Sequence, residues 1–182
     1  MTSRWQRLAQ GLKDKTGART ALARAPGRFV LGINLGGEAV QVLGDRWIGA
    51  DQARDEGLSL PEARTATTQW VPTPYAEPGL RQMLNSVVYR PQALELSLPL
   101  PPGRLLLYLW IMENYQDHWH RLSLSIGGDE IDEGLGHLPL CAWERCGPYA
   151  LAPDQGRLEL VLSTGRPKID AHLMGLSLHE AA

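Results

Sequence analysis

The chain has 182 residues, the size of one ordinary domain with a short appendage. Its apolar content of 43% and charged content of 21% lie near the averages for globular proteins, so they exclude a disordered tail or a fibrous repeat. No apolar run approaches the roughly 18 residues that cross a bilayer, and the basic N-terminal stretch lacks the apolar core of a secretory signal, so we expect a cytoplasmic protein.

The net charge of −2 hides a basic N-terminal arm. Basic side chains dominate the start of the chain, whereas the rest is acidic. Trp5, Leu8 and Leu12 share one stripe of a short amphipathic helix. We expect residues 1–27 to form an arm that is either a solvated leader or a contact to the acidic body, another protein or a polyanion. Nucleic-acid binding is not expected, because the body has no basic stripe.

From residue 28 onward the sequence reads as short strands separated by turns. Residues 28–35 and 39–43 flank the turn Gly36-Gly37, and the leucines of 93–100 alternate with other residues as in a half-buried strand. Residues 49–82 contain scattered prolines, and we expect a largely irregular stretch there. The remaining strands are expected at 86–89, 104–112, 122–126, 149–152, 158–162 and 172–178.

These eight or nine expected strands have no helices between them, whereas parallel βαβ folds require crossover helices. The pattern therefore predicts that residues 28–182 form an all-β domain, an antiparallel β-sandwich or jelly roll. The short amphipathic helix would precede it.

The order of short motifs along the chain resembles the malectin and malectin-like carbohydrate-binding domains. Ile33-Asn34-Leu35-Gly36-Gly37 looks like the opening Ile/Val-Asn-x-Gly-Gly of that family, and residues 47–52 look like its Trp-x-x-Asp segment. The resemblance spans about residues 28–180 and implies a galactose-binding-like β-sandwich. Further similar stretches follow in the family order at 88–90, 96–103, 109–115, 121–128, 156–160 and 174–178.

The resemblance also implies where a ligand would bind. In the family, aromatic side chains on loops at one edge of the sandwich hold a disaccharide together with an acidic residue from a late loop. Tyr89 and Tyr115 fall on two of the aromatic positions. Ala53 stands near a position that is often tyrosine, and Gly165 stands near the late acidic position, with Asp170 as the only close carboxylate. Ligand identity is therefore not carried over from the family.

Residues 113–120 form the most polar and aromatic octet of the chain and are the strongest candidate for a binding site. A flat ring stacks on the C–H face of a sugar, while phenol hydroxyls and indole N–H groups bind its hydroxyls. Asp51 and Glu113 are expected to hydrogen-bond loop backbone and so fix the rim. Packing in the core, or anchoring of a loop, is the alternative for the rings. The predicted ligand-binding residues are Tyr89, Tyr115, Trp119, Asn114, Glu113 and Asp51, with Trp47, Trp70 and Trp143 as further candidate walls.

Two histidines of the octet raise the question of a metal. His118 and His120 would share a face of an extended chain, and with Glu113 or Asp117 they would form a facial metal set. The glutamate that cupin-like spacing requires is missing. Exposed loop histidines are the alternative, and no metal site is predicted here.

Two further groups have simple explanations. The acidic stretch 129–133 is expected to be a solvated hairpin loop, with a bound structural Ca²⁺ as the alternative. Cys141 and Cys146 lack the partners of a zinc site and are expected to be free thiols. No Gly-x-Ser-x-Gly, P-loop or complete dinucleotide motif is present, so neither a catalytic residue nor a cofactor is predicted.

The sequence favours a non-catalytic carbohydrate-binding module for a neutral glycan or another sugar-containing ligand. The alternative is a protein-interaction or scaffold β-sandwich whose N-terminal arm mediates docking or oligomerisation. The third hypothesis is a metal-dependent jelly-roll enzyme that uses His118 and His120.

Overall fold

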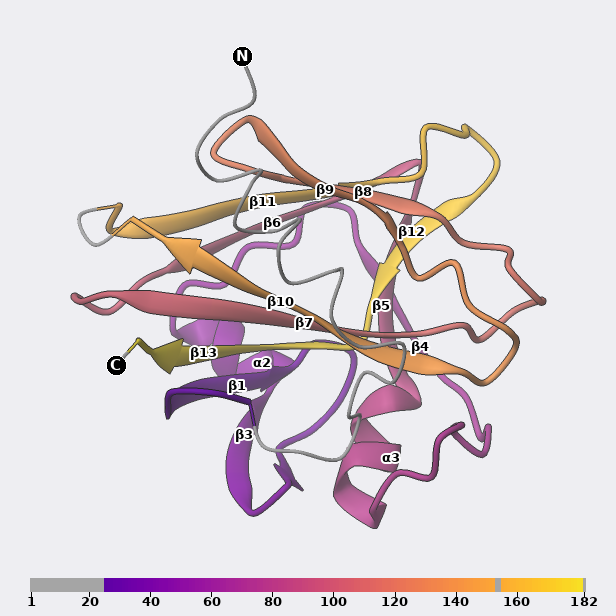
Figure 1. Cartoon of the computed structure of the whole chain (residues 1–182), viewed down its shortest axis with the longest axis horizontal. Helices are drawn as coiled ribbons and strands as arrows, with labels where there is room; N and C mark the ends of the chain where they lie inside the picture. Colours follow the sequence, from indigo (N-terminus) through magenta and orange to yellow (C-terminus); the bar gives the residue numbers. More distant parts are fainter. Residues whose placement is uncertain (1–24, 153–154, 182) are drawn as a thin grey trace.

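Two facing sheets form the sandwich that the sequence predicts (Figure 1). The computed structural model describes residues 25–152 and 155–181. The larger sheet has, in spatial order, β10 (Trp143–Leu151), β7 (Leu105–Met112), β13 (Gly175–Glu180), β1 (Arg28–Asn34), β3 (Asp45–Gly49) and β2 (Val40–Val42). The smaller sheet has β6 (Ala93–Pro99), β11 (Arg157–Ser163), β8 (Leu122–Ile126) and β9 (Asp129–Leu135). The named strands pair antiparallel except β1 with β3, so the prediction of an all-β sandwich is confirmed.

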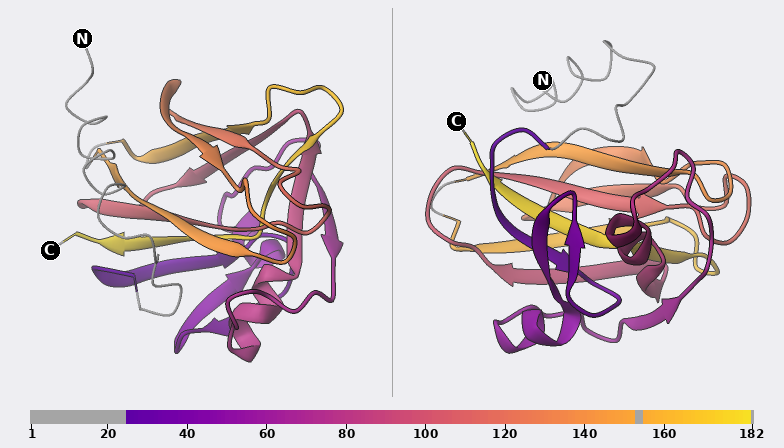
Figure 2. Two further views of the ribbon diagram at one scale, coloured as in Figure 1. Left: turned by 45° about the vertical axis from the view of Figure 1, so that its right-hand side comes forward. Right: turned by 90° about the horizontal axis from the view of Figure 1, so that it is seen from below.

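A third sheet crosses one open edge of the sandwich. It consists of β12 (Asp170–Leu173), β5 (Ser86–Pro91) and β4 (Arg64–Thr67), with β5 in the middle. In the left view of Figure 2, β5 runs from one layer to the other at this edge. The helix α3 (Pro78–Leu84) leads almost directly into β5. This edge carries the candidate site.

Alternating leucines build the core between the two main sheets. Leu160 of β11 pairs with Leu96 of β6 on one side and with Ile126 of β8 on the other. Side chains that face each other across paired strands point to the same face, so one face of this sheet is almost entirely leucine. Fully burying each such side chain contributes about 1.5–3 kcal/mol. The facing positions Leu107 and Leu109 of β7 are likewise completely buried.

A second apolar cluster covers the other face of β7. Trp110 stacks on Trp143 with ring centroids 5.9 Å apart and meets Trp47 edge-on at 5.7 Å. Leu80 and Met83 of α3 belong to the same cluster. Because β7 is buried on both faces, its sequence reads as an unbroken apolar run rather than an alternation. Trp47 and Trp143 are therefore core residues and not walls of a binding site.

The prediction that no helices separate the strands is wrong, and residues 49–82, expected to be largely irregular, contain short regular elements. The helix α2 (Ala50–Asp55) follows β3 directly, and α3 lies between β4 and β5. Glu77 caps α3, because its carboxylate accepts hydrogen bonds from the backbone N–H groups of Gly79 and Leu80. Proline at the first helical position is compatible with a helix start, since its missing N–H has no intrahelical partner there. Both helices are only six or seven residues long, too short for a clear 3.6-residue period.

Two other expectations concern the chain ends and the acidic stretch. Residues 129–133, expected as a loop, belong to β9 and pair with β8 across the turn Gly127-Gly128. The helix expected in the arm and nearly all of residues 1–27 lie outside the described residues. Within the described part of the chain, no helix is long and apolar enough to cross a membrane.

Candidate functional site

The strand register of the third sheet separates core side chains from site side chains. Val88, Ala171 and Leu173 point into the main core and are fully buried. Tyr89 lies opposite His172 of β12, so both project from the other face of the sheet. The loop that follows β7 covers this face, and between the two lies a hollow.

This hollow, which we call the aromatic hollow, has a volume of about 320 Å³. Ligand pockets commonly start near 300 Å³, so it is suited to a small ligand unit. Four of the six predicted residues line it together, although the sequence separates Tyr89 from the others by some 25 positions. Its lining consists of the predicted Tyr89, Asn114, Tyr115 and Trp119 and of Ala66, Thr68, Val87, His120, Lys168, Asp170 and His172.

The aromatic rings of the hollow are available to a ligand. Tyr115 is 65% exposed, and its ring centroid lies 5.1 Å from that of Trp119 with the planes tilted by 51°. A large apolar ring exposed to this degree in a short polar loop gains little from core burial. The alternative of core packing is therefore wrong for Tyr115, whereas Trp119 is half-buried and Tyr89 is partly buried against the second apolar cluster.

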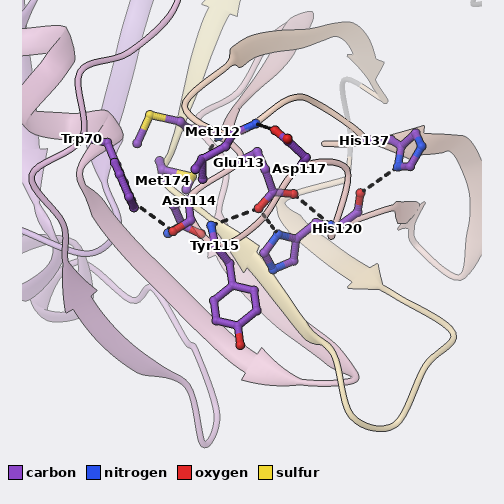
Figure 3. A network of polar contacts seen from close by, with 10 residues as sticks. Trp70, Met112, Glu113, Asn114, Tyr115, Asp117, His120, His137 and Met174 are labelled. Atoms are coloured by element: carbon purple, nitrogen blue, oxygen red, sulfur yellow. Dashed lines mark hydrogen bonds and ion pairs between the residues drawn. The ribbon is translucent and has the colours of Figure 1, made fainter.

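Glu113 lies beneath the loop and fixes it. The residue is completely buried. Its carboxylate accepts hydrogen bonds from the backbone N–H of Tyr115 at 3.1 Å and of His120 at 2.9 Å, and it lies 2.9 Å from Nδ1 of His120 (Figure 3). Burial acts to raise the pKa of Glu113, but the hydrogen bonds from the His120 ring and backbone, helped by the Tyr115 amide, outweigh it and lower this pKa. Glu113 therefore positions the rim from below rather than lining the hollow.

Two stacked histidines form the floor of the aromatic hollow. The ring centroids of His120 and His172 are 3.7 Å apart, with the planes inclined by 28°. His172 is only 2% exposed, and its Nε2 has no hydrogen-bond partner among the described residues. Burial, and secondly the neighbouring His120, hold the pKa of His172 well below its usual value. The floor thus offers a neutral imidazole.

Lys168 and Asp170, from the segment that leads into β12, bring opposite charges to the hollow. Neither side chain has a hydrogen bond or an ion pair with the described residues. An ammonium group donates hydrogen bonds and a carboxylate accepts them. Among the lining residues that the structure describes, Asp170 is the only carboxylate.

Asp51 is placed elsewhere. Its side chain is fully exposed on α2 and pairs with Arg54 at 2.9 Å. It borders a separate hollow that also includes Gly37 and Glu38. Exposed ion pairs of this kind contribute little to stability. The structure therefore does not bring Asp51 to the aromatic hollow.

The two histidines considered for a metal site point apart. His118 has a left-handed backbone, φ 54°, and its ring packs against His137 at 4.9 Å, whereas His120 turns to Glu113. In residues 25–152 and 155–181, no three His, Cys, Asp or Glu residues are grouped to hold a metal ion. In the acidic strand β9, Asp132 accepts a hydrogen bond from the Tyr149 hydroxyl. The structure therefore assembles neither the facial metal set nor a calcium site from these residues.

The sequence analysis did not name His172, Lys168 and, in its role as the floor, His120 as ligand contacts, nor the smaller wall residues Ala66, Thr68 and Val87. The signal for His172 was present. It stands between Ala171 and Leu173, and alternation in a strand that buries both neighbours places it on the opposite face. Cys141 and Cys146, which were expected to be free thiols, form no disulfide in the described part of the chain.

Comparison with known proteins bears on the fold. No protein-family model matches the chain, and no curated protein matches it. Among solved structures, a beta-glucuronidase of Bacteroides uniformis has a TM-score of 0.65 at 11% identity over 84% of this chain, but the match covers only 18% of that protein. The plant receptor-like kinase FER has a TM-score of 0.65 at 13% identity, over 82% of this chain and 41% of its own.

The ANX1 ectodomain from Arabidopsis thaliana matches with a TM-score of 0.57 and 15% identity, over 84% of this chain and 41% of the ectodomain chain. FER is also among the similar structures as a complex with the plant peptide RALF23 and LLG2. The chain thus spans less than half of the solved proteins that it resembles. The similarity to receptor-like kinase ectodomains fits a malectin-like fold, which agrees with the order of motifs in the sequence.

Proposed function

We propose that the aromatic hollow is a non-catalytic binding site for a neutral glycan. The observation that carries the proposal is that Tyr89, Tyr115 and Trp119 line one hollow although they come from separate segments. Protein sites for sugars combine flat apolar faces with a few polar groups that orient the ligand. The malectin-like fold is consistent with this assignment.

Each wall has a chemical role in this proposal. The rings of Tyr115 and Trp119 stack on the C–H face of a sugar ring. Lys168 donates hydrogen bonds to sugar oxygens, and Asp170 accepts them from hydroxyl groups. Because the two charges are opposite, they favour neither an anionic nor a cationic ligand.

The carboxylates argue for binding rather than hydrolysis. Glycosidases use two carboxyl groups on either side of the scissile bond, about 5–9.5 Å apart. Among the described lining residues, Asp170 is the only carboxylate, and the nearby Glu113 is buried and occupied by His120 and the Tyr115 amide. The arrangement supports recognition of a sugar without its cleavage.

The test is calorimetric titration with the neutral disaccharides maltose, cellobiose and laminaribiose. We expect at least one to bind in the micromolar-to-millimolar range and the Tyr115→Ala and Trp119→Ala variants to bind it at least about tenfold more weakly, since a lost aromatic contact is worth about 1.4 kcal/mol. Tyr75→Ala is the matched control, because Tyr75 is 69% exposed but does not line the aromatic hollow.

Unchanged affinity of the Tyr115→Ala and Trp119→Ala variants would contradict the assignment of this site. A wild-type protein that binds none of these disaccharides and no neutral member of a glycan array would contradict the proposed function itself.

A further inference from the structure

A second hollow adjoins the aromatic hollow. It has a volume of about 690 Å³, and we call it the polar hollow. Thr68 belongs to the lining of both hollows. The other lining residues of the polar hollow are Gly37, Glu38, Thr67, Gln69, Tyr75, Ala76, Pro78, Arg81, Gln82, Asn85 and Ser86.

Two hydrogen bonds tie the walls of the two hollows together. The Thr68 hydroxyl donates to Oδ1 of Asn85 at 2.6 Å, and Nε1 of Trp70 donates to the carbonyl oxygen of Asn114 at 3.1 Å. Figure 3 shows Trp70 reaching toward Asn114 beside the loop that carries Tyr115. The side-chain amide of Asn85 also accepts a hydrogen bond from the backbone N–H of Trp70 and donates one to the Trp70 carbonyl oxygen. Thr68, the wall residue that the two hollows share, is therefore held in place by Asn85.

Exposed apolar side chains gather around these two hollows. Among the described residues, the large apolar side chains that remain exposed are Trp70, Val71, Tyr75 and Tyr115. Tyr115 lines the aromatic hollow, Tyr75 lines the polar hollow, and Trp70 bonds the backbone of Asn114 in the wall of the aromatic hollow. Grouped exposed apolar side chains mark binding surfaces, whereas single scattered ones need no explanation.

Unpartnered buried polar atoms accompany both hollows. In the described part of the chain they are Nε2 of His172 and Oδ1 of Asn34. His172 lines the aromatic hollow, while Asn34 is completely buried and donates from Nδ2 to the carbonyl oxygen of Glu38 in the wall of the polar hollow. An unpaired buried polar group costs about 1–3 kcal/mol, and such groups are rare away from functional sites.

We propose that the two hollows form one extended groove that binds a linear neutral oligosaccharide. This inference rests on the proposed function of the aromatic hollow. The first sugar rings lie over Tyr115 and Trp119, and the chain continues across Thr68 to Tyr75, which supplies a second stacking face. Glu38, Arg81 and Gln82 flank the later rings.

The lining of the polar hollow fits the continuation of a neutral sugar chain. Glu38, Arg81 and Gln82 are exposed and have no side-chain hydrogen bonds with the described residues, so they remain free to bind hydroxyl groups. Glu38 accepts hydrogen bonds, Arg81 donates them, and Gln82 does both. An amphipathic helix would instead require a continuous apolar groove.

The test compares each disaccharide with its hexasaccharide: maltose with maltohexaose, cellobiose with cellohexaose, and laminaribiose with laminarihexaose. For the linkage that binds, we expect the hexasaccharide to bind at least about tenfold more tightly. The variants Tyr75→Ala and Arg81→Ala should lose most of this gain and leave the affinity for the disaccharide unchanged. Arg46→Ala, which removes an exposed arginine outside both hollows, is the matched control and should keep the full gain.

The outcomes separate the two proposals. Equal affinity for both chain lengths, or a full length gain in the Tyr75→Ala and Arg81→Ala variants, would overturn the extended groove while the disaccharide site at Tyr115 stands. A wild-type protein that binds neither the disaccharides nor the hexasaccharides would overturn both proposals. Binding of an unstructured peptide library in place of sugars, sensitive to the same variants, would assign the groove to a polypeptide and overturn the oligosaccharide.

Discussion

Replacing Glu113 by alanine is expected to lower the free energy of unfolding by about 3 kcal/mol. The change leaves the backbone N–H groups of Tyr115 and His120 and the His120 ring without their acceptor in a buried place. Hydrogen bonds to a charged group contribute about 1.5–3 kcal/mol, and buried donors without a partner add a desolvation cost. Urea unfolding followed by tryptophan fluorescence measures the loss.

The control for this prediction is another glutamate. Glu130 is exposed on β9, and Glu130→Ala should change stability by less than about 0.5 kcal/mol. Glu113→Gln keeps one acceptor oxygen but turns an N–H₂ group toward the donors, so we expect an intermediate loss. Equal stabilities of the Glu113 and Glu130 variants would show that the carboxylate does not hold the loop.

The Glu113→Gln variant also tests whether the loop must be held in place for a ligand to bind. Because Glu113 bonds the Tyr115 amide, it holds the backbone that carries Tyr115 and leads to Trp119. A folded Glu113→Gln protein should therefore bind a disaccharide more weakly than the wild type, although Glu113 does not line the aromatic hollow. Such an effect acts through the order of the loop, so it should diminish as temperature falls.

Those features that repeat along the chain were predictable from the sequence. The alternating leucines of 93–100 and 158–162 and the paired glycine turns define strands because each has a short-range cause, either burial of every second residue or a backbone turn. The clustering of Tyr89 with Tyr115 was reached through the resemblance to the malectin-like domains. No spacing rule predicts that a residue of β5 meets the loop after β7.

The features that the sequence analysis missed or mispredicted depend on contacts that only the folded chain makes. The short helices α2 and α3 are stabilised by packing and by the Glu77 cap, and a glutamate is not among the usual residues at an N-cap. Asp51 precedes Arg54 by three residues on a helix and forms an ion pair with it there. Its carboxylate therefore contacts its own helix and not the predicted binding site. His172 was overlooked because its signal lies only in its neighbours: Ala171 and Leu173 are both buried, so alternation along the strand places His172 on the opposite face.

Acidification below about pH 6.5 is expected to destabilise the protein through His172. The pKa of this imidazole is held well below its ordinary value in the folded state, first by burial and then by His120. Below about pH 6.5 His172 therefore binds a proton in the unfolded chain but stays neutral in the folded chain. The contribution of His172 to the free energy of unfolding is fully present above this pH. On acidification it falls by up to about 1.4 kcal/mol per pH unit until the pKa of His172 in the folded state is reached.

The groups around His172 define the window in which this effect can be measured. His120 stacks on its ring, Tyr89 lies opposite it on β5, and Lys168 and Asp170 share the hollow. The pKa of Glu113 is lowered from its ordinary value of 4.5, so its contribution to stability is lost only at pH values below that. The interval between about pH 6.5 and pH 4.5 therefore reports mainly on histidine.

Urea unfolding of His172→Phe across this interval provides the measurement, because phenylalanine keeps a ring against His120 but cannot bind a proton. We expect the variant to lose most of the pH dependence, whereas His118→Gln, which changes an exposed histidine, should keep it. If His172→Phe fails to fold, the wild-type protein still decides the point: the ring resonances of His172 should show no titration midpoint at the ordinary histidine pKa of about 6.5. A titration of His172 near pH 6.5, or an unchanged slope in the phenylalanine variant, would mean that the histidine floor is open to water and protons, which contradicts the neutral imidazole beneath the aromatic rings.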